Sequence, residues 1–216
     1  MKVMNKTSLK TKIISDSETA YSQVQQEMAI MKAMNHPNVL KLHEIIDDPK
    51  ETKLYLITEL VKEGTLMTRI RKKTLNEEQI RKIFRQLITA VEYCHTVPKI
   101  VHRDIKPDNV LVDGNDDVKL GDFGVSLLLP ADGSELIKSN AGSDKFYSPE
   151  ACMSSTYKGK LNDLWACGVT LYLMATGEFP FNGKHKKLFE EIQEKKLTYP
   201  PDIARTDLSD LLDKML

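Results

Sequence analysis

The chain is organised around the stretch HRDIKPDN, residues 102–109, followed after a hairpin-like segment by Asp122-Phe123-Gly124. Within six residues it carries a carboxylate, a lysine and an amide, at Asp104, Lys106 and Asn109. Carboxylate and amide oxygens are hard ligands that suit Mg²⁺, which takes only one or two protein carboxylates and keeps several waters. Such a set could hold Mg²⁺ and a phosphate against a nucleophile, so the pattern predicts phosphoryl-transfer chemistry.

A surface loop rich in turn-forming Asp and Asn is the competing interpretation of this stretch. A bare HRD tripeptide would be a chance match. The full stretch, with β-like segments on both sides and DFG at this distance, rarely arises by chance, so we favour the functional interpretation.

The composition is that of an ordinary globular chain, with 216 residues, 41% of them hydrophobic and 29% charged. Lys plus Arg and Asp plus Glu both number 31, so no net field attracts nucleic acid or an anionic membrane. No apolar run approaches the roughly 18 residues of a membrane span, and the polar start does not resemble a signal peptide. Cys94, Cys152 and Cys167 form no CxxC pair and indicate free thiols of a reducing compartment. We expect a cytoplasmic or nuclear protein.

The first part of the chain predicts strand, loop, helix and two strands. Residues 1–5 form a short strand-like piece and residues 6–17 a polar loop. Ser15 and Glu18 resemble a capping box, and apolar residues from Val24 onward follow helical spacing until His36-Pro37 stops the helix. Two alternating segments then predict strands over residues 39–46 and 53–60.

The second part predicts mainly helices. The expected elements are a helix capped by Asn76 and Gln79 that ends near His95, a hairpin of residues 110–112 and 118–120, a helix beginning at Asp163, and helices over residues 188–197 and 208–216.

These motifs occur in an order that resembles the eukaryotic protein kinase family over essentially the whole chain. In that family Asp104 would orient or accept the proton of the substrate hydroxyl, and Lys106 would lie near the transferred phosphate. Asn109 and Asp122 would bind Mg²⁺. The resemblance implies a two-lobed α+β fold, with residues 1–61 as an incomplete small β lobe and residues 62–216 as a mostly α-helical large lobe.

The same resemblance implies an ATP site. Lys2 and Glu27 match the strand lysine and helix glutamate that position the ATP phosphates. Outside this context, Glu27 would be interpreted as a solvated helix charge.

Thr58 corresponds to the small gatekeeper residue, and the backbone of Glu59 and Val61 would meet adenine. Leu111 would form the adenine floor. A plain strand role is the alternative for the hinge side chains. Asp163 would anchor the backbone of the catalytic loop.

Within the family, the hinge Glu59-Leu60-Val61, the stretch 122–126 and the stretch 168–172 look most like calcium/calmodulin-dependent protein kinase kinases. That similarity implies transfer of the ATP γ-phosphate to Ser or Thr of protein substrates, including activation segments of other kinases. Lys106 and Ser143 also resemble serine/threonine kinases. A calmodulin-binding helix normally follows the kinase domain in that family, so calmodulin would act through residues not present here.

Two other functions stay open at this point. Ser143 and the stretch 148–150 resemble a platform for protein substrates, which weakens the case for a small-molecule phosphotransferase. A shortened kinase that only docks partners is the alternative from another class, because no GxGxxG loop precedes Lys2 and no helices follow Leu216. We therefore expect a fragment or shortened gene product with weak ATP binding and little activity.

Regulation gives a further expectation. In the resembled family an activation-segment phosphothreonine commonly pairs with the arginine of HRD, here Arg103. The corresponding position is Asn140, so we expect activity without phosphorylation there, unless Ser139 takes that role. Pairing of Arg103 with a nearby carboxylate is the alternative.

Overall fold

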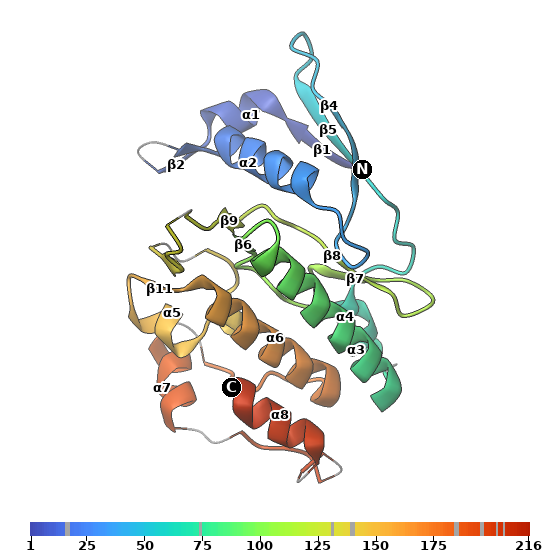
Figure 1. The fold of residues 1–216 in the computed structure, drawn as a ribbon, viewed down its shortest axis with the longest axis vertical. Coiled ribbons are helices and arrows are strands. Elements are labelled where there is room, and N and C mark those ends of the chain that lie inside the picture. The colour runs from blue at the N-terminus through green and yellow to red at the C-terminus, as the bar shows by residue number, and fades with distance from the viewer. Residues whose placement is uncertain are drawn as a thin grey trace.

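The structure is a computed structural model, and Figure 1 shows a small sheet with two helices above a larger helical region. It describes residues 1–15, 18–73, 75–130, 132–138, 141–183, 186–194, 197–201, 203–204 and 206–216. The mixed α+β architecture expected from the sequence is confirmed.

The upper region is built on a three-stranded antiparallel sheet of order β1-β5-β4. The strands are β1 (Lys2–Asn5), β4 (Leu42–Ile46) and β5 (Lys53–Thr58). Leu54 and Leu56 of the central strand β5 are fully buried, as expected where side chains alternate between the two faces of a strand. Lys2 pairs with Leu56 across the sheet, so the lysine lies beside the buried residues of β5.

Helix α2 (Ala20–Ala33) confirms the predicted helix, but its cap differs from the prediction. The side chains of Ser15 and Glu18 lie outside the described residues. The described capping box joins Thr19 and Ser22, which bond each other's backbone N–H groups reciprocally.

The predicted loop over residues 6–17 is wrong for its first part. Residues Lys6–Thr11 form helix α1, and β2 (Ile13–Ser15) pairs with β3 (Glu18–Thr19). Asn5 caps α1 by accepting from the N–H of Ser8, and the buried Lys6 ammonium lies 2.8 Å from an Asp47 carboxylate oxygen. A partner distant in sequence therefore stabilises a segment whose own pattern is polar.

The lower region packs around helix α6, whose residues are mostly buried and which contacts α4 and α8. The described helices here are α3 (Leu66–Lys72), α4 (Glu77–Thr96), α5 (Pro149–Met153), α6 (Gly159–Thr176), α7 (Lys186–Glu194) and α8 (Asp207–Met215). The predicted box of Asn76 and Gln79 is confirmed as the N-terminal cap of α4.

Helix α6 begins four residues before its predicted start at Asp163. Gly159 opens it against Val101, where a Cβ would come within 3.0 Å of a valine methyl carbon. Close packing with a residue distant in sequence therefore sets this helix start, and Asp163 lies inside the helix.

Short two-stranded ladders frame the loops between the helices. They are β6 (Ile100–Val101) with β9 (Leu127–Leu128), β7 (Val110–Val112) with β8 (Val118–Leu120), and β10 (Leu136–Ile137) with β11 (Tyr157–Lys158). The β7–β8 pair confirms the predicted hairpin. In the part of the chain that the structure describes, no helix is long and apolar enough to cross a membrane.

Candidate active site

The HRDIKPDN stretch is the loop between β6 and β7, and Asp163 of α6 holds its backbone. One carboxylate oxygen of Asp163 accepts from the N–H of His102 and the other from the N–H of Arg103, both at 2.8 Å. The His95 Nε2 atom lies 2.8 Å from the first of these oxygens. Asp163 is fully buried, so these bonds satisfy a charge that would otherwise be costly to bury.

The His102 ring links this loop to the DFG segment. Its Nε2 atom donates to the carbonyl of Gly121 at 3.0 Å, and its ring lies 4.9 Å from the buried ring of Phe123. The adjacent Arg103 and Asp122 have φ angles of 71° and 59°, which costs an L-residue about 1–2 kcal/mol each. Buried contacts on both segments hold these strained conformations, as is common at functional sites.

Asp104 has two oxygens with different surroundings. Oδ2 accepts from the Lys106 ammonium at 2.6 Å and from the Asn109 amide at 2.9 Å. Oδ1 is buried and has no hydrogen-bond partner among the described residues. A buried carboxylate oxygen without a hydrogen-bond donor is costly, and such unsatisfied atoms in native proteins call for an explanation, of which a catalytic role is one.

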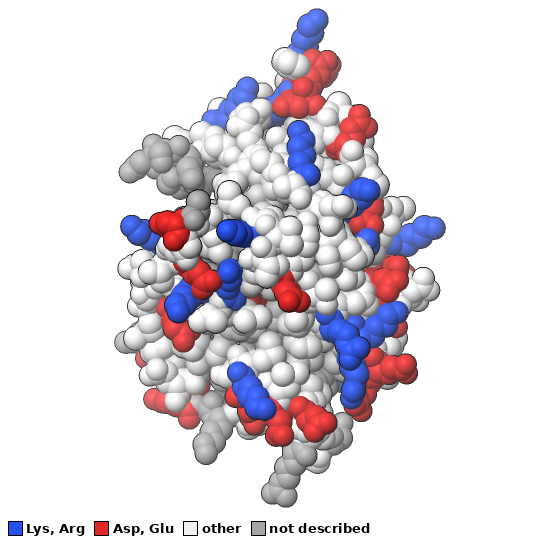
Figure 2. All heavy atoms as spheres, in the orientation of Figure 1, with Lys and Arg blue, Asp and Glu red and all other residues white. Residues whose placement is uncertain are grey.

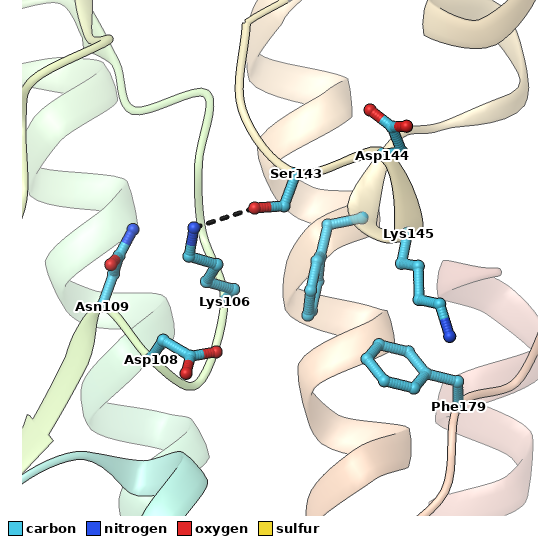
Figure 3. A pocket seen from close by; sticks show the side chains of 8 residues that line it. Lys106, Asp108, Asn109, Ser143, Asp144, Lys145 and Phe179 are labelled. Carbon is cyan, nitrogen blue, oxygen red and sulfur yellow. Dashed lines mark hydrogen bonds between the residues drawn. The ribbon is translucent and has the colours of Figure 1, made fainter. Parts of the chain in front are cut away.

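Lys106 connects Asp104 to the segment that follows DFG. Its ammonium also donates to the Ser143 hydroxyl at 2.8 Å, the bond drawn in Figure 3. The sequence predicted Ser143 at the substrate-facing end of this segment. Its hydrogen bond to Lys106, 37 residues away, could not be predicted from neighbouring residues.

A cavity of about 730 Å³ opens beside these residues. It is lined by Lys106, Asp108, Asn109, Ser143, Asp144, Lys145, Phe146 and Phe179. Its far wall is aromatic, because Phe146 and Phe179 meet edge to face at 5.7 Å and the Lys145 ammonium lies 4.2 Å from the Phe179 ring centre (Figure 3). Neither Lys145 nor Phe179 was predicted as a site residue from the sequence, because neither belongs to the recognised motifs.

A second cavity, of about 370 Å³, lies between the β sheet and the DFG segment. Its lining residues are Met1, Lys2, Glu27, Met31, Leu40, Leu56, Thr58 and Asp122. The Lys2 ammonium bonds both carboxylate oxygens of the buried Glu27, at 2.8 and 2.9 Å. The structure therefore brings four of the predicted nucleotide-site residues, from four segments, to one cavity.

The remaining predicted nucleotide residues are not among the residues that line this cavity. The N–H of Glu59 donates to the carbonyl of Lys41, and the Glu59 carboxylate is held by the N–H of Lys41 and by Lys119 at 2.9 Å. Val61 lies two residues after Glu59, which these bonds hold in place, and Leu111 is half-buried in β7. Their predicted roles concern contacts to adenine and stay predictions.

Asn109 and Asp122 offer too few ligands for a metal ion bound by protein side chains alone. They fit a Mg²⁺ ion that is also bound by the phosphates of a nucleotide. Among the described residues, no three His, Cys, Asp or Glu side chains gather as a metal site. Asn109 uses its amide nitrogen toward Asp104, so its oxygen can serve as a ligand, and the exposed Asp122 supplies a carboxylate. Mg²⁺ normally takes few protein ligands and completes its shell with waters and phosphates.

Gly142 lets the segment after DFG pass directly over the catalytic loop. Its φ is 118°, and a Cβ there would lie 2.3 Å from the carbonyl oxygen of Arg103 and 3.2 Å from Asp104 Oδ1. We expect Gly142→Ala to displace the segment and lower any turnover by about ten- to a hundredfold, since misplacements of about 1 Å can have such effects. Steady-state kinetics would measure this.

Gly133→Ala is the matched control for that prediction. Gly133 has a similar φ of 82°, but no atom lies within 4 Å of its Cβ position. It therefore carries the backbone strain without the clash. Equal turnover in the two variants would contradict the steric explanation.

The visible surface carries interspersed charges of both signs, as Figure 2 shows. This arrangement agrees with the formal net charge of zero.

Comparison with known proteins identifies the family. The pattern of the protein kinase domain matches residues 1–216, and the chain belongs to this family. A Dictyostelium discoideum protein named as a probable serine/threonine-protein kinase is 37% identical, covering 100% of this chain and 31% of that protein. ATP is the phosphate donor of the family.

Two plant relatives show similar identity. CBL-interacting protein kinase 21 of Oryza sativa subsp. japonica is 38% identical over 90% of this chain and 37% of that protein. CBL-interacting serine/threonine-protein kinase 24 of Arabidopsis thaliana is 38% identical over 83% of this chain and 40% of that protein. The chain thus spans well under half the length of these relatives.

Proposed function

We propose that this chain provides the catalytic core of a protein serine/threonine kinase, transferring the γ-phosphate of ATP to a hydroxyl of a protein substrate. The observation that carries the proposal is the state of Asp104. Its Oδ1 atom is buried without a described hydrogen-bond partner, while Oδ2 is fixed by Lys106 and Asn109 beside a large cavity.

The proposed chemistry assigns one task to each residue. Asp104 orients the substrate hydroxyl and accepts its proton, and Lys106 stabilises negative charge on the transferred group. Asn109 and Asp122 would hold Mg²⁺, which supplies charge neutralisation on the phosphates when it is bound. Lys2, oriented by Glu27, binds the phosphates from the side of the sheet.

The proposed two-lobe division places the nucleotide between the lobes. In this proposal residues 1–61 contain Lys2 and Glu27, together with Glu59 and Val61, whose backbone would contact adenine. Residues 62–216 contain the catalytic loop. Thr58 would leave space behind the adenine, because this small residue lines the smaller cavity together with Met31 and Leu56.

The substrate class is supported by the link between Lys106 and Ser143, which ties the catalytic loop to the segment on which a peptide would lie. Two of the relatives named above are named as serine/threonine-protein kinases, the Dictyostelium discoideum protein as a probable one. Activation segments of other kinases are one class of protein substrate that we propose to test.

For the subfamily, the named plant relatives favour CBL-interacting kinases over the calcium/calmodulin-dependent protein kinase kinases suggested by the sequence motifs. A CBL-type partner is therefore the first regulatory partner to test, ahead of calmodulin. A cytoplasmic or nuclear setting fits the three free cysteines, two of which are buried.

The direct test of the function measures phosphate transfer from labelled ATP to peptides that carry Ser, Thr or Tyr as acceptor. We expect transfer to Ser and Thr peptides, at the low rate that the sequence predicts for this chain. Binding of Mg·ATP without any transfer would overturn the enzyme assignment and favour the alternative function, a non-catalytic kinase domain that docks partners.

Metal dependence gives a separate prediction. We expect Asp122→Asn to weaken Mg·ATP binding by about tenfold or more, because a contact to a charged group contributes about 1.5–3 kcal/mol. Calorimetry with Mg²⁺ and with EDTA measures this, and the difference between the two proteins should disappear in EDTA. Asp132→Asn, at an exposed aspartate outside both cavities, is the control. An equal loss in EDTA would contradict a role in metal binding.

A further inference from the structure

The ladder between β6 and β9 leads directly into the catalytic loop. It has two residue pairs, the second of which joins Val101 to Leu127. A strand pair this short is marginally stable by itself. In the same register the next two residues are His102 and Ser126, which lie just outside the strands. These two residues therefore lie opposite each other at the entry to the loop.

The side chain of Ser126 supplies a hydrogen bond at this point. Its Oγ atom donates to the carbonyl of His102 at 3.1 Å. Both residues are almost fully buried, with 3% of Ser126 and 1% of His102 exposed. Because a buried carbonyl without a donor is costly, the hydroxyl stabilises the path of the chain as it leaves β6.

The backbone of Ser126 is itself held on both sides. Its N–H donates to the carbonyl of Phe123 at 3.1 Å, within the DFG segment. Its carbonyl accepts from the side-chain amide of Gln26 at 3.3 Å. Gln26 lies on α2, above β9 in Figure 1. The hydroxyl therefore projects from a fixed backbone and can orient the loop that it contacts.

His102 carries this orientation on to Asp104. The N–H of Asp104 donates to the Nδ1 atom of the His102 ring at 3.3 Å. Since the Nε2 atom of the same ring donates to the carbonyl of Gly121, one tautomer satisfies both ring contacts. A shift of His102 would therefore move the backbone of the proposed catalytic carboxylate.

The bonds of Ser126 also join the two strained positions of the site. Its hydroxyl bonds the residue before Arg103, and its N–H bonds the residue after Asp122. The φ angles of Arg103 and Asp122 are 71° and 59°. Such conformations persist only where surrounding contacts hold them. One buried serine thus connects the loop of the proposed base with the segment of the proposed metal ligand.

We propose that Ser126 is a positioning residue, whose hydroxyl fixes the entry of the catalytic loop, and with it Asp104, relative to the DFG segment. Its effect on turnover rests on the proposed kinase function, but its effect on the order of the loop does not.

The test is Ser126→Ala in the chain of residues 1–216. Alanine removes the hydroxyl but keeps the N–H and the carbonyl that bond Phe123 and Gln26. Hydrogen exchange followed by mass spectrometry should show about tenfold faster exchange over residues 102–106, the factor expected for loss of one typical hydrogen bond. In a peptide assay, kcat should fall by about three- to tenfold with the KM for ATP unchanged, since misplaced groups slow the chemical step.

Ser209→Ala is the matched control. The Ser209 residue is also 3% exposed, and its hydroxyl donates to the carbonyl of Thr206 at 2.8 Å, in the N-terminal cap of α8. The change removes a buried hydroxyl outside both proposed-site cavities. It should speed exchange only near the start of α8 and leave kcat unchanged.

The two readouts separate the two proposals. Unchanged exchange over residues 102–106 in Ser126→Ala, or the same change there in Ser209→Ala, would overturn the positioning role. An unchanged kcat of Ser126→Ala in a chain that transfers phosphate would overturn it as well. Faster exchange over residues 102–106 in a chain that transfers no phosphate would uphold the ordering of the loop by Ser126 while the proposed function fails.

Discussion

In a longer chain that includes a glycine-rich loop before Lys2 and helices after Leu216, replacing Asp104 by asparagine should lower phosphate transfer by about two to four orders of magnitude, the usual contribution of a positioned general base. Asparagine has almost the same shape as aspartate and can remain within reach of Lys106. It cannot accept a proton, however, and the buried position now occupied by Oδ1 would hold a group without basic character. The ATP affinity should change little, because Asp104 is not among the residues that line the smaller cavity.

Turnover and nucleotide affinity should be measured on the same preparation, by peptide kinetics and by calorimetry. Asp132→Asn makes the same chemical change at an exposed site and should leave both quantities unchanged. Near-normal turnover of Asp104→Asn would remove Asp104 from the mechanism.

Asp163→Ala should have the largest effect on stability. The change removes the acceptor for the N–H groups of His102 and Arg103 and for the His95 ring, all in a fully buried position. Removing one partner of buried charged contacts typically costs about 3–5 kcal/mol. We expect a loss of this size in the free energy of unfolding, together with loss of activity, since the catalytic loop loses its anchor.

Urea unfolding followed by circular dichroism would measure this loss. Glu92→Ala, at an exposed position on α4, is the control and should change stability by no more than about 0.5 kcal/mol. A loss below about 1 kcal/mol for Asp163→Ala would show that water or a neighbouring group replaces the carboxylate.

Regulation by residues 139–140 stays a prediction, because those residues lie outside the described part of the chain. The Arg103 guanidinium donates to the carbonyl of Val125 at 3.2 Å, and its pairing with a carboxylate also stays a prediction. The β10–β11 ladder holds residues 136–137 of this segment by backbone hydrogen bonds.

Those features of the fold that depend on neighbours in the chain followed from the sequence. The amphipathic pattern and the reciprocal cap of Asn76 and Gln79 predicted α4 correctly, and two short apolar segments joined by a turn at Asp113-Gly114 predicted the β7–β8 hairpin. Periodicity and capping act over a few residues, so they are visible in one sequence. The motif residues of the site could also be recognised in the sequence, because they lie close together in the chain and each residue type suits its proposed ligand.

Only the tertiary structure decided the contacts that join distant segments. The polar segment after β1 is a helix, and its Lys6 pairs with Asp47, 41 residues away. Helix α6 begins earlier than predicted, at Gly159, which packs on Val101. The bonds from Asp163 to Arg103 and from Lys106 to Ser143 span 60 and 37 residues. Composition and spacing determine which groups are available, but burial and hydrogen-bond satisfaction in three dimensions select which of them pair. Those pairs leave Oδ1 of Asp104 buried without a hydrogen-bond partner among the described residues.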